Sequence, residues 1–116
     1  MIVEVDVWVR GTLHAETHQI EALPDDPGSW DEDDVRRLLC EMLLALEREK
    51  NPGGEQPPVT LRGFSWIVSP DAAGGVLVHL EMQMGTASAG PLAIDEARLT
   101  TMMTRVMARA TAETVH

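Results

Sequence analysis

The sequence contains one cysteine, one phenylalanine and no tyrosine among its 116 residues. A single cysteine, Cys40, excludes a disulfide within the chain, and small secreted domains usually depend on such bonds. No apolar run approaches the roughly 20 residues needed to cross a bilayer. The first residues carry acids instead of the basic start of a signal peptide. These absences predict a cytoplasmic protein that does not enter a membrane.

Positive charge is also scarce, with nine Lys and Arg against 19 Asp and Glu and a net charge of −10. A negative field repels phosphate backbones and anionic lipid, so we expect neither nucleic acid nor a membrane surface as a partner. Residues 21–34 contain seven of the acids and no Lys or Arg. This segment could dock a basic protein partner. The alternative is a solvated loop leading into a helix, whose positive N-terminal end favours acids.

What is present is a typical globular composition, with 44% hydrophobic and 24% charged residues. The length suits a single domain over residues 1–116. With so few aromatic residues the core must be aliphatic, and the seven methionines would fill its irregular gaps.

The first strand is marked by valine at every second position, at Val3, Val5, Val7 and Val9. This period predicts a half-buried strand with its valines toward the core and Trp8 on the other face. We expect a hairpin with a three-residue loop over 10–12, which opposes Val9 to Leu13 and keeps the apolar side chains together. A two-residue turn at Arg10 and Gly11 and a bent continuous strand are the alternatives.

Two amphipathic helices follow from the 3.6-residue period of their apolar positions. The first follows Asp31 as N-cap, with a staple of Trp30 and Val35, and stops at Asn51. Ser29 with Glu32 is an alternative capping box one register earlier. The second begins at Asp95. The apolar faces consist of Val35, Leu38, Leu39, Met42, Leu43 and Leu46, and of Leu99, Met102, Met103, Val106, Met107 and Ala110.

Between the helices the pattern predicts a strand over 59–68, a turn over 69–75 and a returning strand over 76–84. Gly63 interrupts the alternation and suggests a bulge. Pro57 and Pro58 are expected to hold the preceding segment extended. Residues 85–91 are expected to form a loop of small residues. The predicted fold is therefore an α+β two-layer sandwich. It has an antiparallel four-stranded sheet with two helices on one face, in the order ββαββα, or βαββα if the first strand does not turn back.

The residues with the most chemical potential are His14, Glu16 and His18, which share one face if they lie on a strand. Two imidazoles and a carboxylate suit zinc or iron, and His79 lies on the polar face of its own strand and could join them. His and Glu on the wet face of a sheet need no metal to explain them. We therefore expect no cofactor, with the metal site as the alternative.

Aromatic and basic side chains indicate an interface made of Trp8, Arg10 and Trp66, since an exposed Trp beside an Arg is typical of interface anchors. A bulge at Gly63 would instead turn Trp66 inward. No motif for nucleophilic catalysis or phosphate binding is present. We predict a non-enzymatic protein-interaction module that forms a homo-oligomer through a sheet face or edge. The alternatives are a metal-dependent enzyme and a small-ligand binder with a pocket lined by methionines of the last helix.

Overall fold

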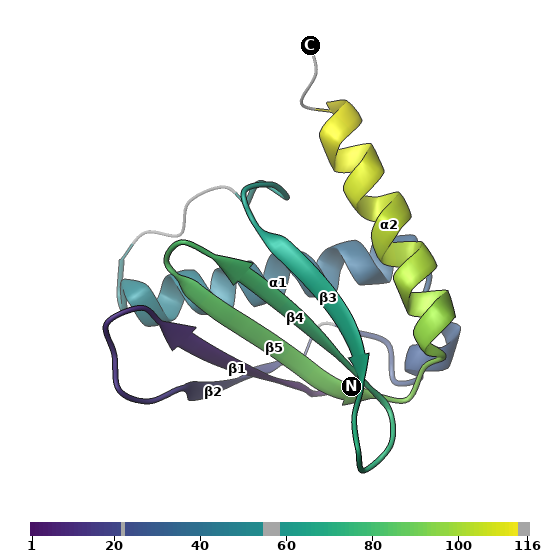
Figure 1. Ribbon diagram of the computed structural model, residues 1–116, viewed down its shortest axis with the longest axis horizontal. Helices are drawn as coiled ribbons and strands as arrows, with labels where there is room; N and C mark the ends of the chain where they lie inside the picture. Colours follow the sequence, from purple (N-terminus) through teal and green to yellow (C-terminus); the bar gives the residue numbers. More distant parts are fainter. Residues whose placement is uncertain (22, 55–58, 114–116) are drawn as a thin grey trace.

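The computed structural model describes residues 1–21, 23–54 and 59–113 and confirms the α+β class. Its elements in chain order are β1 (Val3–Val9), β2 (Glu16–Ile20), the short 3-10 turn η1 (Pro27–Ser29), α1 (Glu32–Lys50), β3 (Ser65–Pro70), β4 (Val76–Met82), β5 (Gly85–Leu92) and α2 (Glu96–Glu113). The described strands form one antiparallel sheet in the order β2-β1-β5-β4-β3 (Figure 1). The four-stranded prediction is wrong, because the sheet has five strands and the order is ββαβββα.

The missed strand is β5, in the segment expected to be a loop. Its small residues carry little strand signal, but β5 lies between β1 and β4 and packs against α1. Ala87 and Ala89 are both fully buried there, so a larger side chain would have no room. A Cβ atom at Gly85 would overlap the carbonyl oxygen of Trp8, so the first residue of β5 must be glycine.

The β1–β2 hairpin forms with a longer connection than predicted. The Thr12 N–H donates to the Val9 carbonyl at 3.0 Å, and β2 then begins only at Glu16. The register opposes Val7 to Glu16, not to the predicted Ala15. This shift of one residue reverses which β2 side chains share a face with the buried valines.

The second half of the sheet begins later than predicted, since β3 starts at Ser65 and residues 59–64 are not a strand. Strand β4 ends at Met82, two residues before the expected end. The turn between β3 and β4 is closed by hydrogen bonds between Asp71 and Gly75 and between Gly74 and Asp71. The expected extension at Pro57 and Pro58 lies outside the described residues.

Helix α1 has the predicted boundaries. Asp31 and Asp34 form a capping box, with a 2.9 Å bond from the Asp34 N–H to the Asp31 carboxylate and a 3.0 Å bond in return, and Asn51 is the C-cap. The alternative box with Ser29 is not formed. Asp95 accepts the Arg98 N–H at the start of α2 at 3.0 Å. No helix among the described residues is both long and apolar enough to span a membrane.

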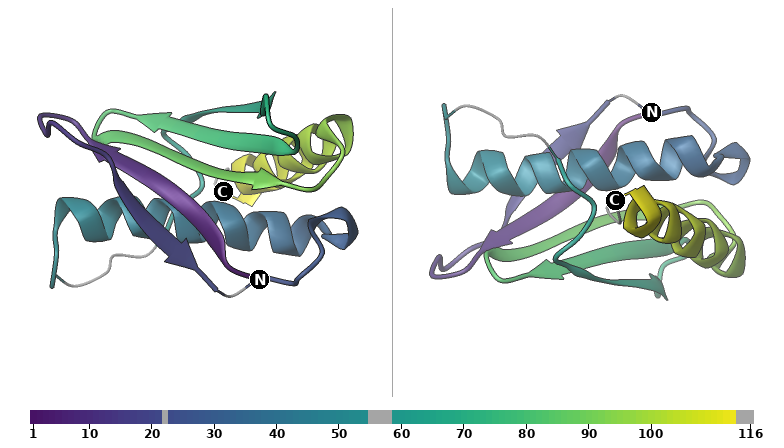
Figure 2. Two further views of the ribbon diagram at one scale, coloured as in Figure 1. Left: turned by 90° about the horizontal axis from the view of Figure 1, so that it is seen from below. Right: turned by 90° about the horizontal axis from the view of Figure 1, so that it is seen from above.

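The core lies between the sheet and the helices (Figure 2). Helix α1 runs along one side of the sheet and contacts β1, β2 and β5, while α2 packs against α1 and beside β3. Trp30 and the apolar faces of both helices join the strand valines in one cluster of buried side chains. No described helix covers the opposite side of the sheet. That uncovered side, here called the open face, is where the candidate site lies.

Candidate interface on the open face of the sheet

The open face is made by every second residue of the five strands. The registers place Thr17, Asp6, Ser88, His79 and Ile67 in one row across the sheet, and Trp8, Thr86, Glu81 and Ser65 in the next. Glu4, Gln19, Leu77 and Ser69 complete the same face at its other end. The alternating residues between them, such as Val5, Ala87 and Leu80, are buried against the helices. The face therefore combines hydroxyl, carboxylate, imidazole and a few apolar groups.

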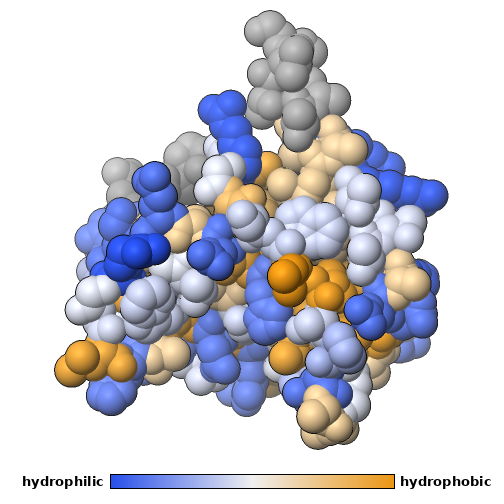
Figure 3. Space-filling view, in the orientation of Figure 1, coloured by the Kyte–Doolittle hydropathy of each residue, from blue (hydrophilic) through white to orange (hydrophobic). Residues whose placement is uncertain are grey.

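The apolar part of the open face lies mainly on β3 and β4. The Ile67 side chain is 60% exposed, the most of any hydrophobic residue in a described strand, and Leu77 on β4 is half-buried. Figure 3 looks onto this face and shows hydrophobic colour right of centre, over β3 and β4, amid hydrophilic surroundings. Ile67 and Leu77 together form an apolar patch at the β3 side of the open face, and such a patch favours contact with another surface.

His79 occupies the middle of the open face between two serines. Its Nδ1 lies 2.8 Å from the Ser88 hydroxyl and its Nε2 lies 3.1 Å from the Ser69 hydroxyl. Since a hydroxyl both donates and accepts, either tautomer of the ring is satisfied. These bonds fix the imidazole in the sheet, beside a hollow of about 260 Å³ lined by Ser65, Trp66, Ile67, His79 and Glu81.

Of the three predicted interface residues, Trp8 and Arg10 lie near the same end of β1. The half-buried Trp8 lies on the open face and donates from Nε1 to the Thr12 carbonyl at 3.1 Å. Arg10 is exposed and donates from Nε to the Gln83 carbonyl at 2.9 Å. Trp66 faces the other way. It stands opposite Leu80, which is buried, and packs against the core. Trp66 therefore lies on the opposite face of the sheet from Trp8, in the inward orientation that was the alternative expectation.

The four residues of the predicted metal site do not meet. The register places Glu16 and His18 on the helix side of the sheet, whereas His79 is on the open face. The His18 imidazole lies 2.9 Å from the Glu49 carboxylate on α1, and His14 is exposed in the β1–β2 connection. Within the described ranges no three His, Cys, Asp or Glu side chains lie close enough to hold an ion together. The expected alignment fails because the hairpin register differs by one residue.

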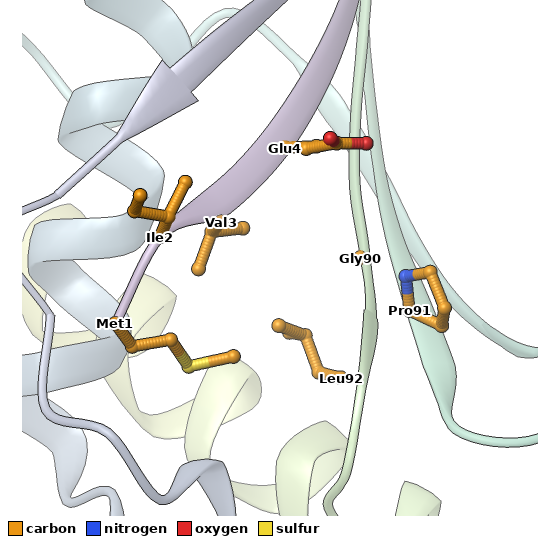
Figure 4. Close-up of a pocket in the computed structure, with 7 residues that line it drawn as sticks. All are labelled: Met1, Ile2, Val3, Glu4, Gly90, Pro91 and Leu92. Carbon is orange, nitrogen blue, oxygen red and sulfur yellow. The ribbon is translucent and has the colours of Figure 1, made fainter.

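The methionine-lined pocket predicted beneath α2 has no counterpart around Met103, which is fully buried in the core. A hollow of about 400 Å³ next to Met102 is not lined by methionines of α2 alone, since Asp31, Glu32, Arg98 and Arg105 are among its lining residues. A second hollow, of about 350 Å³, opens where β1 and β5 separate at Pro91, which has no N–H to pair with β1 (Figure 4). Val3 and Leu92 line it from the two strands.

The acidic segment over residues 21–34 is tied to its own chain. Asp26 accepts the Gly28 N–H at 3.0 Å, and Asp31 and Asp34 cap α1. Glu32 forms ion pairs with Arg109 at 2.7 Å and Arg105 at 3.5 Å. The charge of Glu32 is therefore paired within the chain, and Asp31 and Asp34 lie at the helix start, where acids are favoured.

Sequence patterns missed Ile67, Ser69 and Ser88 as members of the candidate site. Ser88 lies in β5, which looked like a loop, and the irregular segment before β3 hid the alternation of Ser65, Ile67 and Ser69. That alternation is the signal that could have found them. Comparisons of this chain with protein-family models, curated proteins and solved structures give no match. A proposal about function therefore rests on the geometry of the open face.

Proposed function

We propose that this protein is a non-enzymatic protein-interaction module whose open face binds the open face of a second copy. The observation that carries the proposal is Ile67, 60% exposed on the edge strand β3 of a sheet face that no described helix covers. Burying it against a second copy removes apolar surface from water on both sides at once.

The polar groups around Ile67 support a copy of the same chain as the partner. A hydroxyl group can make more than one hydrogen bond, so Thr86, Ser88 and Ser69 can pair with the same groups of a second copy across a two-fold axis. Because Ser69 and Ser88 are each hydrogen-bonded to His79, little of their side-chain freedom is lost on contact.

Charge is also arranged for a two-fold contact. Strand β1 carries Glu4 and Asp6 toward its start, and Arg10 follows its end. When the two-fold axis lies between the two open faces and perpendicular to the strands, the start of β1 in one copy lies over the end of β1 in the other. Arg10 of each copy then approaches acids of its partner, which offsets the repulsion between two negative molecules.

Sedimentation of the whole chain at tens of micromolar tests the proposal. We expect a species heavier than one chain, and a shift toward the single-chain mass for Ile67→Asp. Ala108→Asp is the matched control, because it adds the same charge at an exposed position of α2. A wild type that sediments as a single chain, or an Ile67→Asp variant that associates as well as Ala108→Asp, contradicts the proposal.

A further inference from the structure

The β1–β2 hairpin ends in a leucine held out into water. Leu13 is 91% exposed, more than any other large hydrophobic residue described. The turn before it is fixed by the 3.0 Å bond from the Thr12 N–H to the Val9 carbonyl. Trp8 Nε1 also bonds the Thr12 carbonyl at 3.1 Å. Leu13 therefore follows an ordered turn, which lowers the entropy lost when it is buried.

The same molecule carries an apolar groove of matching size between α1 and the turn from β4 to β5. It is lined by Leu43, Leu44, Val59, Met82 and Met84, with Glu47, Thr60 and Arg62 beside them. Its volume is about 150 Å³. An apolar cavity of about this volume accepts a group as large as benzene, and a leucine side chain has fewer carbon atoms than that.

The leucine and the groove belong to the same end of the molecule. The Arg10 N–H, at the start of the hairpin tip, donates to the Met84 carbonyl at 2.8 Å, and Met84 lines the groove. Leu13 remains exposed, so it does not fill the groove of its own chain. A two-fold axis beside this end would bring each Leu13 to the groove of the other copy and close the contact as a dimer.

The charges beside the two features are complementary. The neighbours of Leu13 include His14 and Glu16, both exposed, and the groove holds Glu47 and Arg62. Glu16 of one copy suits Arg62 of the other, and the imidazole of His14 suits the carboxylate of Glu47. The stretch from Trp8 to Ala15 contains Arg10 and no acid, so the hairpin tip can approach the carboxylate of Glu47 without repulsion from an acid within that stretch.

We infer that Leu13 of one copy inserts into the groove of a second copy, in a reciprocal contact separate from the open face. Disulfide trapping between two different variants tests this, with Cys40→Ala in both to remove the native thiol. One variant carries Leu13→Cys and the other Leu44→Cys, so that a disulfide between them must join two molecules. Leu44 is half-buried and lies at the groove, outside the core cluster.

We expect mild oxidation of the mixture to give the mixed disulfide in clear excess over a mixture of Leu13→Cys with Ala108→Cys, whose cysteine lies on α2. Ile67→Asp added to both chains should leave this yield unchanged, because the open face is not involved. A yield no higher than that of the Ala108→Cys control overturns the inference.

A second measurement does not depend on cysteine chemistry. Leu13→Ser changes only an exposed tip, so folding should be unaffected, and circular dichroism checks this. Burial of each leucine is worth roughly tenfold in affinity, so loss of both should weaken this contact about 100-fold. In an Ile67→Asp background, sedimentation should show that Leu13→Ser removes the remaining self-association. Association that is unchanged by Leu13→Ser overturns the inference.

Discussion

Replacement of Trp30 by alanine should remove a large part of the stability of the fold. Trp30 is fully buried, and its Nε1 donates to the Pro24 carbonyl at 3.0 Å. Its own carbonyl accepts from Arg98 Nη2 at 2.7 Å, and the same guanidinium also binds the Gly28 carbonyl. The indole thus joins the segment before α1 to the core, and its neighbouring backbone joins that segment to the start of α2.

The expected size of the effect follows from the cavity that the substitution leaves. Truncation of a fully buried Trp to Ala costs about 3–5 kcal/mol of unfolding free energy, out of a total of roughly 5–15 kcal/mol for a domain of this class. At roughly 4 °C per kcal/mol, the melting temperature should fall by about 12–20 °C. Trp30→Phe keeps most of the apolar contact and loses the indole hydrogen bond, so it should cost about 1 kcal/mol beyond the smaller ring.

Urea denaturation followed by far-ultraviolet circular dichroism measures these effects without relying on tryptophan fluorescence. Trp8→Ala is the matched control, because Trp8 is half-buried on the open face and part of its ring is already in water. Its loss should be clearly smaller. If Trp30→Ala lowers the unfolding free energy no more than Trp8→Ala does, Trp30 does not join the segment before α1 to the core, and the prediction is refuted.

Two further predictions concern titratable groups. Hydrogen bonds from backbone N–H groups, that of Asp34 first, lower the pKa of the Asp31 carboxyl. The stabilisation that ionised Asp31 gives the fold should therefore be complete above its ordinary pKa of about 3.9 and be lost as pH falls through the lowered value. In thermal melts from about pH 5 to pH 2, the melting temperature of Asp31→Ala should fall less with pH than that of wild type or Asp33→Ala. Equal falls in melting temperature would contradict the capping role. Burial raises the pKa of the Cys40 thiol, so at pH 8 a disulfide reagent should label the native chain more slowly than the urea-unfolded chain, and equal rates would show Cys40 to be freely accessible.

Local patterns in the sequence were sufficient for the elements whose signals come from neighbouring residues. Val3, Val5 and Val7 of β1 are buried, Asp31 caps α1, and Asn51 ends it. The hairpin of β3 and β4 forms at the predicted turn. In each case a period of 2 or 3.6 residues, or a cap of fixed spacing, sets the structure without reference to the rest of the chain.

Tertiary structure alone decided the features that depend on distant partners. Strand β5 is built of small residues because α1 packs on it, and no local pattern reports the position of a helix some 40 residues earlier. The β1–β2 register differs from the predicted one by a single residue, and that difference moves Glu16 and His18 to the helix side, away from His79. Side chains alternate strictly along a strand, so a small error in turn length reverses a whole face.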